Sequence, residues 1–337
     1  MKKKVLITGI TGMVGSHLAD YLLKETNHKI YGACRWRSPT DNVMHLSKHV
    51  NDGKRLFFEY MDLSDSHSIN TLIKKIKPDY VFHLAAQSFP LASFQMPDIT
   101  YDININGTHR LLNSINDCSI SPLIHICSSS EVFGKVSKKY LPIKENTPFH
   151  PASPYAISKV GTDLIASFFN QAYGLNIIIT RMFTHTGPRR SDFFAESSFA
   201  KQIALIEEGY QKPTVMVGNL KSLRTISDVR DAVRAYYMLL TIRPTPGEIY
   251  NIGGDKSLTV GGILDYLLSI SKYDGKIKIL VDKKRLRPID ADLQIPDTSK
   301  FRKHTKWKPK ISFQKTLEDL LNYWREKVKK NGEFINR

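Results

Sequence analysis

Two residues in the segment PASPYAISK could exchange protons with a substrate. Tyr155 and Lys159 lie four residues apart, and the amphipathic pattern that follows them predicts a helix, so both side chains should share one helical face. A lysine ammonium beside a phenol favours the phenolate. We therefore expect Lys159 to lower the pKa of Tyr155 from its ordinary value of about 10.

A carboxylate, Glu131, directly follows a run of serines in the segment CSSSEVFG. The serines end an apolar run that is typical of a buried strand, which puts Glu131 just beyond the carboxyl end of that strand. Ligands bind at such strand ends in open α/β sheets. Glu131 is therefore a candidate site residue, with an ordinary surface or salt-bridged carboxylate as the alternative.

The segment TGITGMVG places three glycines, Gly9, Gly12 and Gly15, between a predicted strand and a predicted helix at about residues 13–24. Glycines there permit a tight turn and the close approach of a pyrophosphate, which the amides of the helix N-terminus can bind. The spacing is G-x-x-G-x-x-G, one residue longer than the commoner dinucleotide motif. The segment predicts a dinucleotide site; the alternative is a helix start that simply uses glycine.

The end of the second predicted strand, CRWRSPTDN, bears on which dinucleotide is bound. It carries Arg35, Arg37 and Ser38, and the next carboxylate is Asp41. An acidic residue at such a strand end would bind the adenosine ribose of NAD, whereas arginine can accommodate the 2′-phosphate of NADP. We therefore expect NADP, with NAD as the alternative. Asp62, after FFEYM, is placed to meet the adenine end, although aspartate at a strand end also commonly caps a helix.

The elements that must position these residues alternate regularly. Short β-branched runs are separated by longer amphipathic stretches; the runs are KVLITG, KIYGACR, RLFFEYMD, DYVFHLAA, PLIHICSS and NIIITRM. This alternation predicts an α/β fold, a doubly wound parallel sheet of the Rossmann type with helices on both faces. The carboxyl ends of its strands should line one crevice.

After about Arg181 the alternation loosens into loops rich in proline, glycine and charge, and one later run, EIYNIGG, could return to the sheet. We expect residues 1–180, with about 220–255, to form the dinucleotide-binding domain. Residues 181–219 and 256–330 should form a smaller, mixed α/β substrate domain.

The amino-acid composition argues against several kinds of partner and site. The 337 residues include 49 Lys and Arg against 32 Asp and Glu, and 49 − 32 gives the net charge of +17, which favours anionic partners. The basic residues are dispersed and no run of about 18 apolar residues occurs, so we expect no nucleic acid or membrane partner. The basic start breaks into glycines before a leader could form, which favours a cytoplasmic protein. Three cysteines without C-x-x-C spacing, Cys34, Cys118 and Cys127, predict neither a disulfide framework nor a metal site.

These segments together resemble the extended short-chain dehydrogenase/reductases from Lys3 to about Trp324. Within that superfamily the chain most resembles the GDP-mannose 4,6-dehydratases, and in particular the bacterial branch that acts on GDP-D-glycero-D-manno-heptose. The shared segments, in the same order, are TGITGMVGSHLADYLL, HLAAQS, NINGT, SSSEVFG, SPYAISK, GPRRSDFF, GNL, RPIDAD and WKPKISF.

The resemblance implies a dehydration with internal hydride transfer. Ser129 would bind the sugar's 4-oxygen, Tyr155 would take the 4-OH proton and Lys159 would hold the nicotinamide ribose. Glu131 would take the C5 proton, which is acidic once C4 is a ketone. Water would leave from C6 and the hydride would return there, so the tightly bound cofactor would be recycled.

The resemblance also implies binding residues. Those for the cofactor are Gly9, Thr11, Gly12, Met13, Val14, Gly15, Arg35, Arg37, Asp62, Leu63, Leu84 and Ala85, together with Tyr155 and Lys159. Those for the GDP-sugar are Ser88, Ser130, Thr184, Arg189, Asn219, Arg224 and Arg287. The last two match positions that contact the diphosphate, which suits the planar fork of arginine. Relatives are homodimers or homotetramers, and we expect the same here by analogy.

Two residues depart from the family pattern. Phe133 stands where tyrosine is usual, which should change packing only, and Thr184 stands where the enzymes acting on GDP-mannose usually have asparagine. The second departure leaves the substrate and the elimination step open. The alternatives are a redox-only C4 dehydrogenase, reductase or epimerase of a GDP-sugar, in which Glu131 is idle or shapes the pocket, and a cofactor-binding regulatory protein without catalysis.

Overall fold

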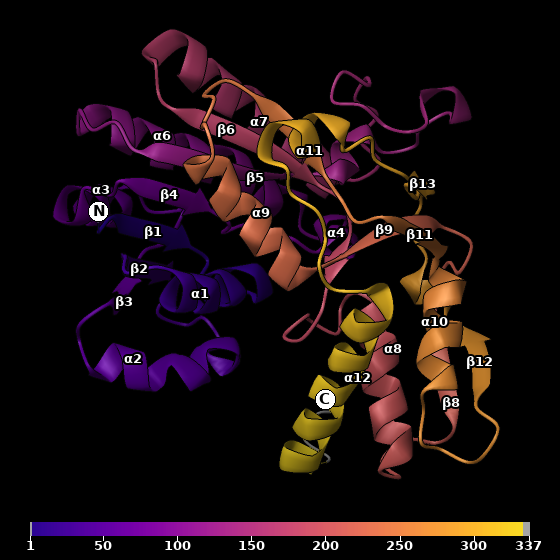
Figure 1. Ribbon diagram of the computed structural model, residues 1–337. Coiled ribbons are helices and arrows are strands. Elements are labelled where there is room, and N and C mark those ends of the chain that lie inside the picture. Colours follow the sequence, from indigo (N-terminus) through magenta and orange to yellow (C-terminus); the bar gives the residue numbers. More distant parts are fainter. Residues whose placement is uncertain (1, 333–337) are drawn as a thin grey trace.

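The computed structural model describes residues 2–332, and its larger sheet confirms the predicted doubly wound architecture (Figure 1). Seven strands, all parallel, lie in the order β10-β6-β5-β4-β1-β2-β3. Their bounds are β1 Lys4–Thr8, β2 Lys29–Cys34, β3 Leu56–Tyr60, β4 Tyr80–His83, β5 Leu123–Ser129, β6 Ile177–Met182 and β10 Ile249–Ile252. The run EIYNIGG returns to this sheet as β10, as the sequence suggested.

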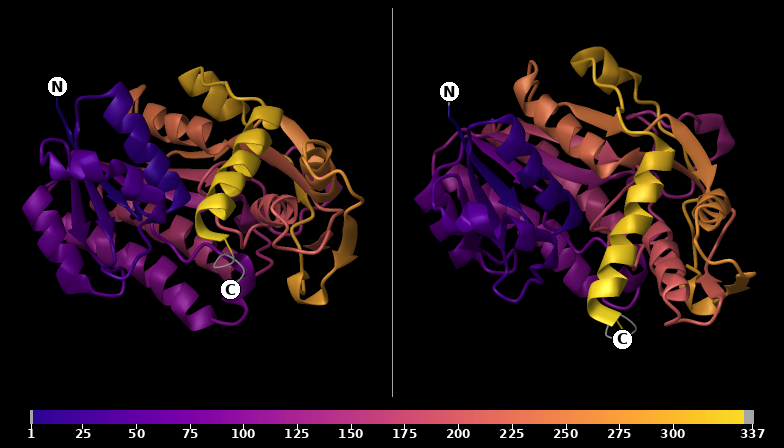
Figure 2. Two further views of the ribbon diagram at one scale, coloured as in Figure 1. Left: turned by 90° about the horizontal axis from the view of Figure 1, so that it is seen from below. Right: turned by 60° about the horizontal axis from the view of Figure 1, so that its bottom comes forward.

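Helices cover both faces of this sheet because its buried strands alternate their side chains between two cores. Val5 and Ile7 of β1 pack in one core with helices α1 and α9, whereas Leu6 packs in the other with α3, α6 and α7. The bounds are α1 Met13–Glu25, α9 Val229–Thr241, α3 Ser66–Ile76, α6 Gly107–Asp117 and α7 Pro154–Tyr173. Figures 1 and 2 show this three-layered part on the side of the N-terminus.

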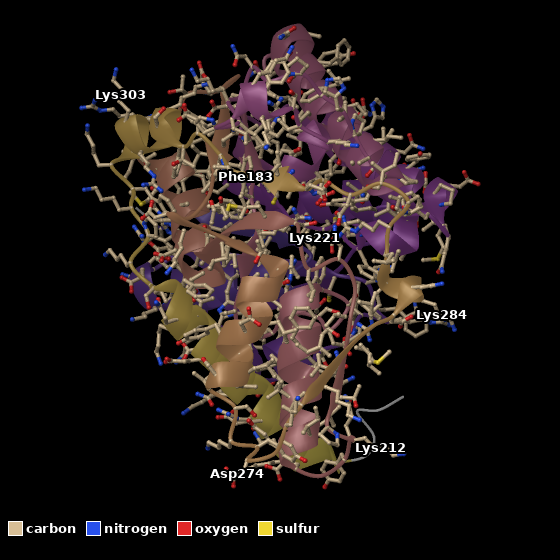
Figure 3. The ribbon with its side chains drawn as sticks, turned by 90° about the vertical axis from the view of Figure 1, so that its right-hand side faces the viewer. Phe183, Lys212, Lys221, Asp274, Lys284 and Lys303 are labelled. Carbon is tan, nitrogen blue, oxygen red and sulfur yellow. The ribbon has the colours of Figure 1, made fainter. Side chains whose placement is uncertain are left out.

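A smaller region lies beside the sheet and has its own apolar core. It contains the two-stranded pair β8 and β12, and a second small sheet in which β9 pairs with β7, β11 and β13. The bounds are β7 His185–Thr186, α8 Ala195–Glu207, β8 Thr214–Val217, β9 Leu223–Asp228, β11 Lys256–Thr259, α10 Val260–Ser269, β12 Lys278–Val281, β13 Leu293–Gln294 and α12 Phe313–Asn331. In Figure 3, Lys212 and Asp274 lie at the end of the molecule opposite Lys303.

The remaining helices are short connections. They are α2 Ser47–Asn51, α4 Pro90–Ser93, α5 Pro97–Tyr101 and α11 Ser299–Thr305. Each described helix, short or long, falls below the length or the apolarity needed to cross a membrane.

The chain passes more than once between the two regions. The sequence-based division places about 220–255 with the larger domain, but β9 pairs within the smaller sheet, and only α9 and β10 pack with the larger one. β9 was not identified as a strand from the sequence, and a local pattern says nothing about a strand's pairing partner. We propose that the larger domain regains the chain at Val229.

Candidate functional site

A cavity of about 1430 Å³ opens at the carboxyl ends of the parallel strands. It lies where the strand order reverses between β1 and β4, which is where ligands bind in sheets of this type. The smaller region contributes the opposite wall through residues of α8, β8 and β9.

Nearly all the residues predicted from the sequence line this one cavity. They are Gly9, Thr11, Gly12, Met13, Val14, Gly15, Arg35, Asp62, Leu63, Leu84, Ala85, Ser88, Ser129, Ser130, Glu131, Tyr155, Lys159, Thr184, Arg189, Asn219, Arg224 and Arg287. Arg37 is the exception. Its guanidinium lies over the ring of the exposed Trp36, 4.4 Å from the centroid, so the structure does not bring it to the cavity.

The glycine turn after β1 is shaped for close approach of a ligand. Gly9 has a φ of +73°, and a Cβ added there would lie 2.9 Å from the Cα of Ala85. A Cβ at Gly15 would lie only 2.3 Å from the carbonyl oxygen of Gly9. Gly12 stands at the N-cap of α1 and lacks a side chain, so the first amides of the helix remain available to an anion. The turn therefore fits the pyrophosphate of a dinucleotide.

The far end of the cavity is formed after β2 and β3. Arg35 and Ser38 line it, and so does Asn42, which the sequence did not suggest and whose amide donates to the carbonyl of Thr11 at 3.1 Å. Asp62 also lines the cavity, while its Oδ1 accepts from the amide (2.9 Å) and hydroxyl (2.7 Å) of Ser64. Asp62 thus caps the turn and faces the cavity at once.

Tyr155 and Lys159 project from the first turns of α7 and are 8% and 7% exposed. Ser153 caps this helix and Pro154 occupies its first turn, so the sequence fixes where the helix begins. Lys159 Nζ donates to the carbonyl of Cys127 at 2.8 Å. The ammonium group therefore lies against the carboxyl end of β5, close to Ser129.

Burial raises the pKa of Tyr155 above its ordinary value. A hydrogen bond with Ser129 and the charge of Arg190 oppose this, while Cys127 and Glu131 add to it. The expectation that Lys159 lowers this pKa is wrong in this structure, because burial dominates and the ammonium group bonds to the backbone of Cys127. Burial also lowers the pKa of Lys159 itself, against the influence of Cys127 and Asp163.

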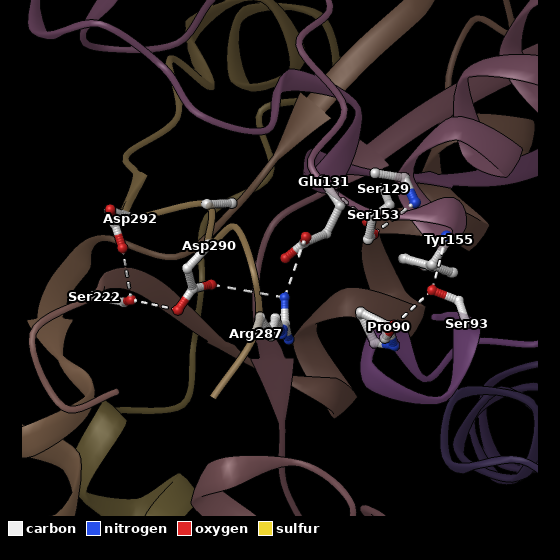
Figure 4. Close-up of polar contacts among 12 residues, drawn as sticks. Pro90, Ser93, Ser129, Glu131, Ser153, Tyr155, Ser222, Arg287, Asp290 and Asp292 are labelled. Atoms are coloured by element: carbon white, nitrogen blue, oxygen red, sulfur yellow. Dashed lines mark hydrogen bonds and ion pairs between the residues drawn. The ribbon is translucent and has the colours of Figure 1, made fainter. Parts of the chain in front are cut away.

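A chain of alternating charges runs from Glu131 through Arg287 to Asp290 (Figure 4) and continues to Arg224. Arg287 Nη1 lies 3.5 Å from Glu131 Oε2 and 3.8 Å from Asp290 Oδ1, and Arg224 Nη2 lies 3.3 Å from that same oxygen of Asp290. Asn219 and Ser222 each donate to the other oxygen of Asp290 at 3.0 Å. The aspartate thus stands between two guanidinium groups that would otherwise repel each other.

The charge of Asp290 is stabilised by this arrangement. Burial alone would raise the pKa of Asp290, but Arg224 and Arg287, with the bonds from Asn219 and Ser222, outweigh burial and hold it below its ordinary value. The sequence did not single out Asp290, although it lies in the quoted segment RPIDAD.

Two arginines of the segment GPRRSDFF differ in their surroundings. Arg189 has a φ of +69° and its Nη1 lies 2.7 Å from Asp20 of α1. Arg190 is more deeply placed: its Nε lies 3.3 Å from Glu196 and its guanidinium 3.4 Å from the ring centroid of Phe194. Arg190 lies in the quoted segment GPRRSDFF, and the second arginine and the two phenylalanines of that segment were the available signal.

Other lining residues were missed. Phe89 and Phe193 stack with their ring centroids 5.0 Å apart, and Arg285 donates to the hydroxyl of Ser198 at 3.0 Å. Each pair joins segments far apart in the sequence, so no local motif identifies it. Among the described residues, no group of three His, Cys, Asp or Glu is arranged to hold a metal ion.

Known proteins resemble this chain over nearly its whole length. The sequence profile of the GDP-mannose 4,6 dehydratase family matches residues 6–320. GDP-mannose 4,6 dehydratase 1 of Arabidopsis thaliana is 33% identical over 350 residues, which cover 99% of this chain and 94% of that protein. The GDP-mannose 4,6 dehydratase of Homo sapiens is 31% identical over 340 residues, covering 94% and 90%.

Solved structures share the fold. RMD from Pseudomonas aeruginosa, complexed with NADPH, superposes with a TM-score of 0.82 at 27% identity, covering 97% of this chain and 100% of its own. DesIV, a dTDP-glucose 4,6-dehydratase from Streptomyces venezuelae with NAD and TYD bound, gives a TM-score of 0.82 at 25% identity, covering 97% and 98%.

Proposed function

The chain belongs to the GDP-mannose 4,6-dehydratase family, and on this premise we propose that it dehydrates a GDP-sugar to the 4-keto-6-deoxy sugar. The observation that carries the proposal is the position of Glu131. This carboxylate lines the same cavity as Ser129, Tyr155 and Lys159, so a second proton acceptor stands beside the groups needed for oxidation at C4.

The residues act in order on one sugar ring. Ser129 binds the 4-oxygen and Tyr155 takes its proton, while a bound nicotinamide dinucleotide supplies the chemistry of accepting a hydride from C4 and returning it at C6. Glu131 then takes the C5 proton, which the new ketone has made acidic. The same proton can pass to the departing C6 hydroxyl, so that water leaves and the carboxylate is restored. The proton that Tyr155 took from the 4-OH balances the proton that C5 regains when C6 is reduced.

NADP is the proposed cofactor, with NAD as the alternative. The glycine turn would hold the pyrophosphate, Lys159 the nicotinamide ribose, and Arg35 with Ser38 the 2′-phosphate. Support comes from the absence of a carboxylate at the end of β2 itself, Lys29–Cys34, and from one cationic and one hydroxyl side chain, Arg35 and Ser38, that line the cavity there.

Arg224 and Arg287 are the proposed ligands of the diphosphate. They converge on Asp290 at the cavity wall, and paired guanidinium forks match the oxygens of a diphosphate. We propose GDP-mannose or GDP-D-glycero-α-D-manno-heptose as the substrate. The GDP-heptose is proposed because the shared sequence segments resemble those of the branch of the family that acts on it.

A redox-only reaction at C4 is the second candidate, and one contact favours it. Glu131 Oε2 lies 3.5 Å from Arg287 Nη1, and an oxygen that faces a cation is not directed at a carbon-bound proton. Thr184, in place of the usual asparagine, points the same way. In that reaction Glu131 would shape the cavity without taking a proton.

The purified protein, incubated separately with GDP-mannose and with the GDP-heptose and without added cofactor, distinguishes the two by mass spectrometry of the nucleotide sugar. Loss of one water supports the dehydratase and names the substrate. Loss of two hydrogens, or a change that requires an added oxidant or reductant, supports the redox-only enzyme. We further propose a cytoplasmic homodimer or homotetramer.

A further inference from the structure

A third ionisable side chain stands in line with Tyr155 and Lys159 on α7. Asp163 follows Lys159 by four residues, as Lys159 follows Tyr155, so all three share one face of the helix. Asp163 is only 1% exposed. It lies outside the cavity lining and has no part in the chemistry proposed above, so its burial needs a separate explanation.

Asp163 is held by a buried ion pair with Arg181 of β6. Arg181 Nε donates to Asp163 Oδ2 at 2.7 Å, and the two side chains are 5% and 2% exposed. Arg181 Nη1 also donates to the carbonyl of Glu145 at 2.6 Å. Burial raises the pKa of Asp163 and the charge of Arg181 opposes this; because a guanidinium stays protonated, the carboxyl group has a fixed cation 2.7 Å away.

The pair lies directly behind the catalytic strand end. Arg181 is the register partner of Ser128 on β5, one residue from Ser129. The rings of Phe133 and Phe149 enclose its guanidinium, with centroids at 5.3 and 4.7 Å. The ion pair therefore lies in a region shielded from water, where a charge acts strongly on its neighbours.

Lys159 needs such a neighbour because its ammonium group is buried. The ionisable groups that face it are Asp163 from its own helix, Cys127 and His125 from β5, and His83 from β4. Burial lowers the pKa of both histidines to about 3 and raises that of Cys127, so these three groups are neutral near pH 7. Asp163 is the one acid of this set that a cation, Arg181, holds directly.

We propose that Asp163, held by Arg181, is a positioning residue for Lys159, which keeps the ammonium group charged and directed at the carboxyl end of β5. The proposal rests on the role given to Lys159 in the proposed function. Without the anion, desolvation acts on the lysine unopposed, and the ammonium group loses its proton at a lower pH.

The test follows NADPH binding, by the fluorescence of the nucleotide, and turnover of the GDP-sugar across the alkaline pH range. In the wild type both should persist until Lys159 loses its proton. In Asp163→Asn the alkaline limb of both profiles should move down by about 1–3 pH units, the effect of losing one nearby opposite charge. Asp163→Glu, which keeps the charge, should return the limb toward its wild-type position.

A second buried ion pair provides a matched control. Glu207 and Arg325 join α8 to α12 with an Nε to Oε2 distance of 2.7 Å and side-chain exposures of 6% and 14%, and neither lines the cavity. Glu207→Gln should destabilise the fold to a similar extent and leave both pH profiles unchanged. An unshifted limb in Asp163→Asn, or an equal shift in Glu207→Gln, would overturn the proposal.

Comparison with Lys159→Arg shows whether the alkaline limb of each profile reports proton loss from Lys159, because a guanidinium keeps its proton throughout this range. If Asp163→Asn does not fold, the pH profiles of the wild type still test the proposal. If the wild-type profile falls below about pH 8 because Lys159 loses its proton, burial lowers the pKa of Lys159 with no opposing charge. That result would overturn the proposal. The binding profile is independent of dehydration, so a protein that binds NADPH without removing water contradicts the proposed function alone.

Discussion

At the scale of single residues, the decisive side chain is Glu131. Its position next to Tyr155 and Ser129 gives it the geometry of a base, while Arg287 Nη1 lies 3.5 Å from its Oε2. A diphosphate that binds Arg287 would compete with the carboxylate for this cation. The two roles of Arg287 are therefore compatible with the proposed dehydration.

Changing Glu131 to Gln keeps the size of the side chain and removes the proton acceptor. We expect water loss to fall by about 10²–10⁴-fold, the usual contribution of a general base. Oxidation at C4 should persist, seen as the absorbance of reduced nicotinamide on mixing with substrate. Unchanged dehydration in this variant would remove Glu131 from the mechanism.

The sequence identified residues that act within short motifs and missed those that act through space. Ser129, Tyr155 and Lys159 lie in contiguous segments, whereas Asp290 meets Asn219 across 71 positions of the chain. The pKa of Tyr155 was misjudged for the same reason. Four-residue spacing shows that a lysine is near, but it does not show how completely the phenol is buried.

At the scale of elements, the end of β2 is expected to bind the cofactor's 2′-phosphate through Arg35, with Ser38, and not through Arg37. Arg35→Ala should weaken NADP binding by about 10–100-fold, the loss of a hydrogen bond to a charged group, and NAD binding much less. Arg37→Ala is the control, because Arg37 lies on Trp36 outside the cavity lining. Calorimetry with both nucleotides measures the difference, and equal losses for NADP and NAD in Arg35→Ala would contradict this reading.

The start of β9 presents Arg224 to the diphosphate. Arg224→Met should lower the affinity for GDP by about 10–100-fold. Lys221→Met removes the same charge three residues away, from an exposed side chain that does not line the cavity. GDP affinity that fell equally in both variants would show that net charge, and not a contact by Arg224, governs binding.

Long elements could be predicted from the sequence and short ones could not. The first helix was expected at about residues 13–24 and spans Met13–Glu25, because its glycine turn and apolar spacing mark it. Strands β7 and β13 have two residues each, too few to show any periodicity. β9 was not identified as a strand, and its pairing in the smaller sheet depends on contacts that no local pattern records.

At the scale of the whole molecule, the exposed face of α7 supports the proposed oligomer. Ile157, Leu164 and Phe168 are 45%, 59% and 52% exposed and share one side of this helix. An apolar stripe of this kind is typical of an interface between copies. Leu164→Glu with Phe168→Glu should reduce the mass found by light scattering to that of one chain, and a wild type that is already monomeric would contradict the proposal.

The fold as a whole brings a basic chain around one deep cavity that suits an anionic substrate. The net charge of +17 favours the approach of a nucleotide sugar, and the wall formed by the smaller region supplies its arginines. The sequence predicted the doubly wound sheet, and nearly all the site residues that it predicted line the cavity. The sequence did not show how the smaller region packs against the sheet, because that packing joins segments that are far apart in the chain.

The most direct test of the central claim follows a deuterium placed at C4 of the GDP-sugar, with no cofactor added. If the protein is an internal redox dehydratase, the product has lost one water and carries the deuterium at C6, as NMR and mass spectrometry would show. A product that keeps all its oxygen atoms, or that loses the deuterium to an added oxidant, would contradict the account.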